Sequence, residues 1–457
     1  MPTLDWIGKK AVLNHHREVP FHLLKEVTEL SAGEGDSGNL LVEGDNLLAL
    51  KALLPYYAGQ VKCIYIDPPY NTGNENWIYN DAVNSPEMRN WLGKVVGGEA
   101  EDLSRHDKWL CMMYPRLALL REFLREDGVL IVSIDDFEAY RLRILMDEIF
   151  SPRNFIAQLI WDKTRKNDAK LFSVGHEYLI VYAKSLNYLK ERRTIWREQK
   201  PGAREISAYW QELRAQYGDQ YDVIQEHLRT WYRSLPASHP AKKLSRYRWV
   251  DQYGPWRDRD ISWPGGGGPR YDVIHPTTGI SCKVPERGWG FATPEEMQRQ
   301  INIGLVVFRG DHTQPPFRKA HLLPIAEEID ATEDDADSEE SIDEDAGLLV
   351  MPSVIQKQAQ VSVRLLRNIF DGRKVFPNPK DHEVIQRLIR YVTAPGDLVL
   401  DSFAGSGTTG HAVLQLNQDE KGAKRKFILV EMMPEIARDI TAERLKRVIH
   451  EIGRAHV

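Results

Sequence analysis

The sequence predicts a doubly wound α/β fold, in which one sheet with helices on both faces is interrupted by a large insertion. Two observations predict it. Short apolar runs alternate with amphipathic helical patterns from residue 40 to residue 184, and this alternation returns near residue 355. Residues 185–345 break the rhythm and contain seven of the twelve tryptophans. We therefore expect three parts, at 1–184 with an N-terminal arm at 1–38, at 185–350 and at 351–457.

Local patterns predict the individual elements. Apolar runs bounded by Gly, Pro or Asp predict seven strands. They lie at 40–42, 61–66, 129–134, 155–161, 178–183, 398–400 and 427–430. Apolar residues spaced three and four apart predict helices. They lie at 21–30, 47–54, 106–126, 137–149, 381–393 and 407–416, with a last helix after Glu431. Gly128 is expected to end the helix at 106–126, and residues 71–105 are expected to form a long polar loop.

Composition limits the class of protein. The chain has 457 residues, of which 42% are hydrophobic and 28% charged, as is typical of a globular protein with two or three domains. It shows neither a signal peptide nor an apolar run long enough to span a membrane. Its three cysteines are widely spaced, which favours a reducing cytoplasm and offers no spacing for a metal site.

The net charge of the chain indicates which partners it can bind. The formal net charge of −6 at first disfavours nucleic acid, but residues 327–345 hold twelve acids and no Lys or Arg. Leaving out these twelve acids turns the net charge from −6 to +6, so the rest of the chain is mildly basic and permits DNA binding. The acidic run itself is predicted to be a solvated, disordered loop. A second hypothesis is that it mimics phosphate and competes for the DNA-binding groove.

An acidic-proline motif follows the strand at 61–66, at Asp67-Pro68-Pro69-Tyr70. An acid, two prolines and an aromatic ring make a rigid polar pocket with a flat wall, which suits a planar ring that carries an amine. Asp67 can accept a hydrogen bond from the amine, and the restrained backbone can offer the Pro68 carbonyl as a second acceptor. Tyr70 can stack on the ring face. The alternative is that Pro-Pro simply forms a turn after the strand.

A glycine-rich turn follows the strand at 398–400, at Asp401-Ser402-Phe403-Ala404-Gly405-Ser406-Gly407-Thr408-Thr409. Such a turn lets the backbone approach a ligand closely. It lacks the lysine of a phosphate-binding loop, which disfavours a nucleotide triphosphatase. Glu431, at the end of the next strand, suits the hydroxyls of a ribose. Alone, each feature is also compatible with an ordinary turn or strand end.

Together these motifs resemble those of β-group DNA amino-methyltransferases, and most of all the modification subunits of type III restriction–modification systems. The segments that carry the resemblance are DPPYNTG at 67–73, MYPRL at 113–117, DGVLIVSIDD at 127–136, HEYLIVYAK at 176–184, HPTTG at 275–279, RGWGF at 287–291, FPNPK at 376–380 and DSFAGSGTTGHAV at 401–413. They cover most of the chain in the order that the family shows.

The resemblance implies a fold and an activity. The fold is the seven-stranded, Rossmann-like sheet of methyltransferases that use S-adenosylmethionine (SAM), circularly permuted so that the chain enters at the third strand. Residues 185–350 are expected to be an inserted target-recognition domain, and the flanking parts to be the catalytic and cofactor-binding halves. The implied reaction is site-specific methylation of adenine N6, because Asp precedes Pro-Pro-Tyr here, whereas cytosine N4 enzymes more often carry Ser.

The resemblance also assigns roles to residues. Asp67 and the Pro68 carbonyl, held by Pro69, would bind the target amine, and Tyr70 would stack on the extruded base. The SAM pocket would be formed by nine residues: Asp401, Phe403, Gly405 and Gly407 around the cofactor, Glu431 on its ribose, Asp45 near its adenine ring, and Phe376, Asn378 and Lys380 at its methionine end. No metal is expected, and His176 and Glu177 are interpreted as structural.

The partners implied are double-stranded DNA, a second copy of the chain in a homodimer, and a restriction subunit with helicase activity. The chain is shorter than expected for a type III subunit, so an orphan methylase or one in another phage-defence system is an equal alternative. Cytosine N4 methylation and a non-catalytic DNA-specificity subunit are the rival functions. Basic residues at 192–204 could contact phosphates or could form a solvated helix face.

Overall fold

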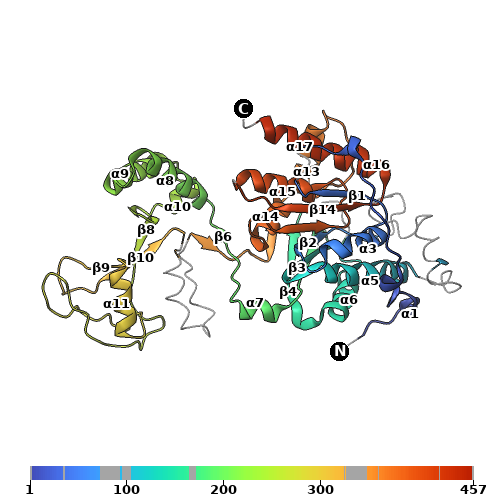
Figure 1. The fold of residues 1–457 in the computed structure, drawn as a ribbon. Coiled ribbons are helices and arrows are strands. Elements are labelled where there is room, and N and C mark those ends of the chain that lie inside the picture. The colour runs from blue at the N-terminus through green and yellow to red at the C-terminus, as the bar shows by residue number, and fades with distance from the viewer. Residues whose placement is uncertain are drawn as a thin grey trace. The chain divides into compact units, whose positions relative to one another are not determined.

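The structure is a computed structural model that describes residues 3–33, 37–72, 93–94, 104–163, 171–323, 325, 347–358, 360–420 and 422–454. The acidic run at 327–345 and most of the predicted loop at 71–105 lie outside these residues. The chain divides into two compact units (Figure 1). The first comprises Met1–Trp196 and Pro352–Val457, and the second comprises Arg197–Met351.

One eight-stranded sheet forms the centre of the first unit. Its strands, in spatial order, are β1 (Leu40–Glu43), β14 (Lys426–Glu431), β13 (Leu398–Asp401), β2 (Val61–Ile66), β3 (Leu124–Ile134), β5 (His176–Ala183), β4 (Phe155–Asp162) and β12 (Val354–Gln356). Only β5 runs antiparallel to its neighbours among these strands. All seven predicted strands are present, and β12 is an eighth that its three residues were too few to reveal.

The strand order confirms the predicted permutation. Counted from β13 as the first strand, the sheet reads third, second, first, fourth, fifth, seventh, sixth, with the short β12 added at the edge. The chain enters at β1, the third strand of this count, and returns to the first two strands only after the second unit. Long-range pairing of β13 with β2 therefore joins the two ends of the chain into one sheet.

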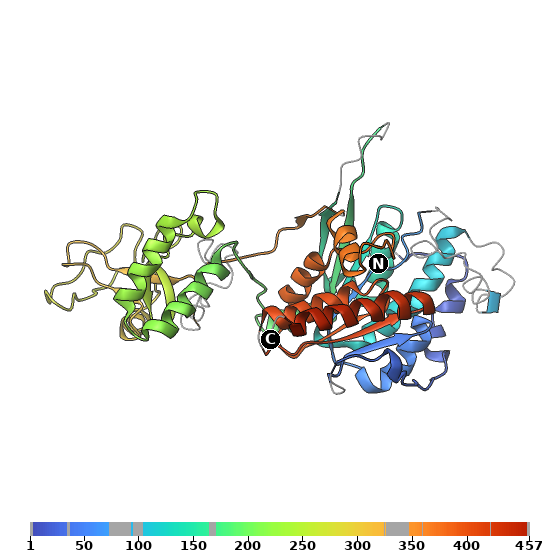
Figure 2. The ribbon, with the colours of Figure 1, turned by 90° about the horizontal axis from the view of Figure 1, so that it is seen from above.

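Helices cover both faces of the sheet (Figure 1). On one face lie α3 (Asn46–Tyr57), α5 (Arg105–Phe123) and α6 (Ala139–Phe150). On the other lie α14 (His382–Val392), α15 (Thr408–Asp419) and α17 (Glu443–Arg454), which stand in front of the sheet when seen from above (Figure 2). The remaining helices of this unit are α1 (Lys9–Val12), α2 (His15–Glu18), η1 (Thr28–Leu30), η3 (Pro152–Asn154), α7 (Leu186–Glu191), α13 (Gln360–Ile369), α16 (Pro434–Ile436) and η5 (Ala437–Ala442).

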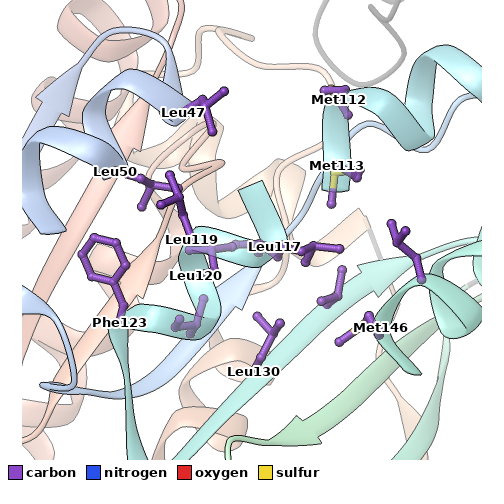
Figure 3. Packing of buried hydrophobic residues seen from close by; sticks show 14 of the residues in the cluster. Leu47, Leu50, Met112, Met113, Leu117, Leu119, Leu120, Phe123, Leu130 and Met146 are labelled. Atoms are coloured by element: carbon purple, nitrogen blue, oxygen red, sulfur yellow. The ribbon is translucent and has the colours of Figure 1, made fainter. Parts of the chain in front are cut away.

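The main core lies between the sheet and the helices α3, α5 and α6. Figure 3 shows Leu50 of α3, Leu120 and Phe123 of α5 and Leu130 of β3 gathered in this layer, and all four side chains are fully buried. Each buried side chain of this size stabilises the fold by about 1.5–3 kcal/mol relative to exposure. The core therefore fixes β2 and β3, whose ends carry the site described below.

The predicted end of the helix at 106–126 is wrong. Helix α5 ends at Phe123, and Gly128 lies inside strand β3 instead of ending the helix. The pairing of β2 with β3 shifts register next to Val61, and a Cβ on Gly128 would lie 2.9 Å from the carbonyl oxygens of Val61 and Arg125. Gly128 thus marks a bulge where two backbones approach closely, a role that local sequence does not distinguish from a helix stop.

The helix predicted at 21–30 is also wrong. The only helical turn there is η1, and Leu23 is 97% exposed while Phe21 is 63% exposed. A short amphipathic helix is marginal in water unless its apolar face packs against a surface. Here most of that face has no buried surface to cover, so the segment before η1 has no helical structure.

The second unit is built from short elements around two small cores. Its helices are α8 (Ala203–Tyr217), α9 (Tyr221–Ser234), α10 (Pro240–Lys243) and α11 (Pro294–Asn302). Its strands β7 (Trp249–Asp251), β8 (Gly254–Arg259), β10 (Phe317–His321) and β9 (Val306–Val307) form an antiparallel sheet, and β6 (Glu198–Gln199) pairs with β11 (Leu348–Leu349). In both units, none of the described helices combines the length and the hydrophobicity needed to cross a bilayer.

Candidate active site

The ends of strands β2 and β13 create the site. The two strands are parallel neighbours, so their carboxyl ends lie at the same edge of the sheet. The chain passes from β13 to its neighbour β14 on one side, whereas it passes from β2 to its neighbour β3 on the other. Ligands of open α/β sheets bind outside the carboxyl ends at such a switch in strand order. Asp67, directly after β2, and Asp401, the last residue of β13, both reach this point.

A cavity opens between these two strand ends. It is lined by Tyr65, Asp67, Phe376, Asn378, Lys380, Asp401, Phe403, Ala404, Gly405, Ser406, Thr408 and Thr409. The structure thus brings together the acidic-proline motif, the glycine-rich turn and the FPNPK segment. Six predicted site residues do not line the cavity, namely Pro68, Pro69, Tyr70, Asp45, Gly407 and Glu431.

The glycine-rich turn is held in a conformation that favours glycine. Gly405 and Gly407 have φ angles of +52° and +76°, in the left-handed region. Thr441 donates a hydrogen bond from its hydroxyl to the Gly405 carbonyl over 2.6 Å, and its Cγ2 would lie 3.0 Å from a Cβ on Gly407. Helix α15 starts directly after Gly407, so the positive end of its dipole adjoins the cavity that Thr408 lines.

Asp401 is a buried carboxyl that organises this turn. It accepts hydrogen bonds from the Phe403 backbone N–H over 2.9 Å and from the Thr409 hydroxyl over 2.5 Å. Burial raises the pKa of Asp401 to about 7, against the smaller opposing effect of these hydrogen bonds. Burial therefore favours the protonated form of this carboxyl.

Glu431 and Asp45 also shape the backbone near the cavity. The two oxygens of Glu431 accept hydrogen bonds from the N–H groups of Gly405 and Met433, each over 2.9 Å. Asp45 caps helix α3 and lies 3.0 Å from the guanidinium of Arg116. The roles predicted for these two acids toward a ribose and an adenine ring stay predictions.

A compact charged cluster surrounds Asp67. The Lys380 ammonium lies 3.0 Å from Asp67 Oδ1 and 3.0 Å from Glu177 Oε2. A second ammonium, that of Lys163, lies 2.5 Å from Glu177 Oε2. Tyr70 donates its hydroxyl hydrogen to Glu177 over 2.9 Å, and Lys380 lies 4.6 Å from the centroid of the Tyr70 ring. Two acids and two lysines thus compensate one another, with Asp67 nearest the cavity.

Burial and these neighbours act on the pKa values in opposite directions. Burial raises the pKa of Asp67, and the positive charge of Lys380 opposes that rise. Burial alone would also raise the pKa of Glu177, but the positive charges of Lys163 and Lys380 outweigh burial, so this pKa is lowered. Burial lowers the pKa of Lys163 to about 8, although Glu177 opposes this. The pKa of Lys380 is raised, because the negative charges of Asp67 and Glu177 outweigh the effect of burial.

One oxygen of Asp67 lacks a well-aligned hydrogen-bond donor. Asp67 Oδ1 is buried, and the Lys380 ammonium lies 3.0 Å from it, at the distance of an ion pair but without the alignment of a regular hydrogen bond. Buried carboxylate oxygens almost always accept hydrogen bonds, so an unmatched one at a cavity wall points to a donor that arrives from outside. An N–H group of a bound ligand would supply it.

The turn after the motif is anchored by groups that the sequence patterns did not reveal. Asn71 is 1% exposed, has a φ of +59° and donates its amide hydrogen to Glu138 over 2.5 Å. His106 Nδ1 also lies 2.5 Å from this carboxylate, which is fully buried. Trp109 donates its indole hydrogen to the Pro69 carbonyl over 2.6 Å. These contacts fix the path of the backbone on both sides of Tyr70.

The sequence analysis interpreted Glu177 as structural, whereas the structure places it in the charged cluster around Asp67. A signal was present, because Glu177 is the one acid in β5, whose other residues after His176 are apolar or aromatic. Lys and Glu side chains are almost never fully buried unless they are paired. A lone acid in an apolar strand therefore predicts a buried cationic partner, although the partner itself could not be named without the fold.

Comparison with known proteins places this site in a family. A family model described as DNA methylase matches residues 61–443. The chain belongs to the DNA methylase family. The match begins at strand β2 and ends at the start of α17, so it includes both motifs of the site.

Similar proteins include modification subunits of type III enzymes. This DNA methylase family member is 31% identical to the EcoP15I Mod subunit of Escherichia coli, over 94% of this chain and 64% of the relative. It is 30% identical to the EcoPI Mod subunit of Escherichia phage P1, over 94% of this chain and 63% of the relative. The chain thus spans somewhat less than two thirds of these relatives. Among solved structures, the PvuII DNA methyltransferase (cytosine-N4-specific) aligns with 90% of this chain and over 91% of its own chain. The sequence identity is 13% and the TM-score is 0.39.

Proposed function

We propose that this protein is a SAM-dependent DNA methyltransferase that transfers a methyl group to N6 of an adenine flipped out of a specific double-stranded DNA sequence. The observation that carries the proposal is the meeting of Asp67 with the Gly405 turn across the parallel neighbours β2 and β13. An acceptor for an amine and a turn suited to a cofactor thereby share one cavity. Restriction–modification or phage defence is the setting that the relatives favour.

The residues around the cavity fit SAM. Phe376 and Phe403 offer aromatic surface, the positive end of helix α15 suits a carboxylate, and Asn378 offers both a donor and an acceptor. The glycine turn lets backbone approach the ligand closely. When bound, SAM supplies an electrophilic methyl group on a sulfonium. We assign its binding to Phe376, Asn378, Asp401, Phe403 and Gly405, with Gly407 and Glu431 shaping the turn.

The chain's own groups prepare the amine. The lone pair of an aromatic amine is delocalised into the ring, so the nitrogen is a poor nucleophile. Asp67 and the Pro68 carbonyl would accept the two amine hydrogens and localise electron density on the nitrogen. Asp67 Oδ1, which lacks a well-aligned donor in the structure, would gain one. The proton that the amine must lose would find its nearest acceptor in the same carboxylate, held ionised by Lys380.

Tyr70 is assigned to the extruded base. Taking a base out of the duplex costs a few kcal/mol, and stacking on an aromatic ring offsets about 1–3 kcal/mol of that cost. Lys380 contacts the Tyr70 ring and Glu177 accepts from its hydroxyl, so the ring is held in place before the base arrives. A ring fixed in advance loses little conformational entropy on stacking.

The second unit is assigned to target recognition, and the partners follow from the relatives. The unit lies in the chain between strands β5 and β12 of the large sheet, and none of its described helices and strands is part of that sheet. We infer that the protein acts on double-stranded DNA in the cytoplasm, as a homodimer, with a restriction subunit that has helicase activity as its partner. The Mod subunits named above belong to type III restriction–modification enzymes.

One experiment tests the function. The wild type and Asp67→Ala would be expressed in a host without DNA methylation, and the modified bases would be mapped by single-molecule sequencing. We expect N6-methyladenine at one sequence motif for the wild type and none for the variant. N4-methylcytosine alone would replace the adenine assignment by cytosine N4 methylation. Failure of the purified protein to bind SAM would favour a non-catalytic specificity subunit.

A further inference from the structure

A basic cleft lies in the second unit, between helices α9 and α10 and strand β7. It encloses about 470 Å³ and is lined by Tyr232, Ser245, Trp249 and four cationic side chains, those of Arg229, Arg233, Lys242 and Arg248. No carboxylate is among its lining residues in the described part of the chain. The cleft is separate from the catalytic cavity, and it does not include the basic residues at 192–204 that the sequence singled out.

Four positive charges meet at this cleft without an acidic partner among the residues that the structure describes. Within the described ranges, none of these side chains forms an ion pair with an acid. Arg229 Nε is buried without a hydrogen-bond partner, and Lys242 is held at the cleft by donating to the Tyr232 carbonyl over 2.5 Å. Arg229 and Arg233 are four residues apart on α9, a spacing at which like charges repel. The fold therefore carries a repulsion that a bound polyanion would relieve.

The tryptophan in the cleft is not open for stacking on a base. Trp249 stacks on Trp256 with ring centroids 5.1 Å apart and an interplanar angle of 17°. The guanidinium carbon of Arg248 lies 4.4 Å from the Trp249 ring centroid. The Trp256 ring and the Arg248 guanidinium thus already occupy stacking positions on the Trp249 ring. The cleft thus offers positive charge and hydrogen-bond donors, and it lacks the exposed aromatic platform of single-strand binding sites.

We propose that this cleft binds the phosphate backbone of duplex DNA and contributes affinity without reading the base sequence. Guanidinium groups match phosphate oxygens with paired hydrogen bonds, and such contacts position a protein on DNA without specifying bases. Arg229 gains the acceptor that it lacks, and the mutual repulsion of Arg229 and Arg233 is relieved. The inference rests on the proposed function only in taking DNA as the polyanion.

The test uses the full-length protein and a fluorescein-labelled duplex of about 30 base pairs. Arg233→Gln/Arg248→Gln removes two exposed cleft charges while keeping polar side chains. The matched control is Lys243→Gln/Lys283→Gln, which removes two exposed charges of the same unit outside the cleft. Binding would be followed by fluorescence anisotropy over a series of KCl concentrations. Circular dichroism would show that each variant is folded.

We expect the cleft variant to bind roughly tenfold more weakly, and to the same extent on two unrelated sequences. Each phosphate that the protein no longer neutralises lowers the salt slope of log K by about 0.9, so the slope should fall by about 2 in the cleft variant and stay unchanged in the control. Arg233→Lys/Arg248→Lys, which restores both charges, should restore most of the slope.

Three outcomes would overturn the inference. The first is an equal salt slope for the wild type, the cleft variant and the control. The second is a weakening confined to one DNA sequence, which would indicate base contacts. The third is unchanged DNA binding together with loss of binding to a synthetic peptide of residues 327–345, which would assign the cleft to an acidic polypeptide. Calorimetric titration with SAM keeps the two proposals apart, because absence of SAM binding removes the methyltransferase while leaving the cleft result intact.

Discussion

Lys380 Nζ lies 3.0 Å from Asp67 Oδ1, so an ammonium from the C-terminal part of the chain contacts the acid that follows β2. Lys380 also lies within 3.2 Å of both oxygens of Glu177. Charges this close in a buried site shift one another's pKa by about 1–3 units. Lys380 is thus placed to keep Asp67 ionised in surroundings that raise its pKa.

Lys380→Gln should make methyl transfer dependent on higher pH. Burial raises the pKa of Asp67 and Lys380 opposes the rise, so removing the ammonium lets the pKa rise further. A larger fraction of Asp67 would then be protonated at a given pH, and a protonated carboxyl accepts more weakly from the amine. We expect the acid limb of kcat/KM to move up by about 1–3 pH units, with recovery at high pH. A pH series at saturating SAM measures this shift.

Lys380→Arg is the control for that change, because it keeps the positive charge. Its acid limb should stay near that of the wild type even if the rate is lower for steric reasons. Parallel profiles for Lys380→Gln and the wild type would show that Lys380 does not act on the ionisation of Asp67.

Glu177→Gln should destabilise the fold strongly. Its carboxylate contacts both Lys163 and Lys380, and the Glu177 and Lys380 side chains are only 5% and 9% exposed. Removing one partner of a buried pair leaves an uncompensated charge and costs about 3–5 kcal/mol. Urea unfolding measures the destabilisation. Glu383→Gln is the matched control, since its pair with Lys357 is exposed and should cost less than about 1 kcal/mol. Equal effects would contradict a charged cluster that depends on Glu177.

Asp401→Asn should flatten the pH dependence of stability in the acidic range. The pKa of Asp401 is about 7 in the folded protein, whereas the ordinary value for an aspartate is 3.8. Between these values the unfolded chain is ionised while the folded one holds its proton. The free energy of unfolding therefore falls by about 1.4 kcal/mol per pH unit from this group as pH rises, and it levels off above pH 7. The variant lacks this contribution.

Urea unfolding of both proteins at several pH values between about 4 and 8 measures the difference. Asn keeps an acceptor for the Phe403 N–H and can donate to Thr409, so the local contacts are retained. The two curves should lie close together near pH 4, and the wild-type curve should fall progressively below the variant's as pH rises to 7. A constant difference between the two curves would show that Asp401 does not titrate in this range.

Gly407→Ala should impair both the fold of the turn and SAM binding. A left-handed residue with a side chain costs about 1–2 kcal/mol, and here the new Cβ would also lie 3.0 Å from Thr441 Cγ2. Gly396→Ala is the control, because its φ is +85° but nothing lies within 4 Å of the new Cβ. In both variants the strained left-handed residue should lower the free energy of unfolding. Only Gly407→Ala should bind SAM more weakly in calorimetry. Equal SAM affinities would separate the turn from the cofactor.

Tyr70→Ala should weaken methyl transfer by roughly 5- to 150-fold, since stacking on the extruded base contributes about 1–3 kcal/mol. Tyr70→Phe keeps the ring and loses the hydroxyl, which donates to Glu177 and accepts from Lys380, so its defect should be smaller. The ratio of kcat/KM values for the two variants isolates the ring. Equal defects would assign the role of Tyr70 to its hydroxyl.

Local patterns in the chain were sufficient for the sheet. All seven predicted strands are present, because runs such as 61–66 are apolar throughout and end at strong turn signals. The permuted strand order was implied by the resemblance to SAM-dependent methyltransferases, which assigned the motif at each strand end to a place in the sheet. Asp67 and the glycine-rich turn could therefore be placed at one cavity before any coordinates were known.

Contacts between distant segments needed the tertiary structure. Glu177 and Lys163 reach Asp67 and Lys380 only because β5 pairs with β3 and β4 pairs with β5, and no local pattern encodes which buried charges will meet. The role predicted for Gly128 is wrong for the same reason, as its requirement comes from the backbone of β2. The basic cleft combines helices α9 and α10, the turn that follows them and strand β7. Periodicity reports on the hydrogen bonds and burial of one segment, whereas ion pairs and close approaches depend on how segments pack.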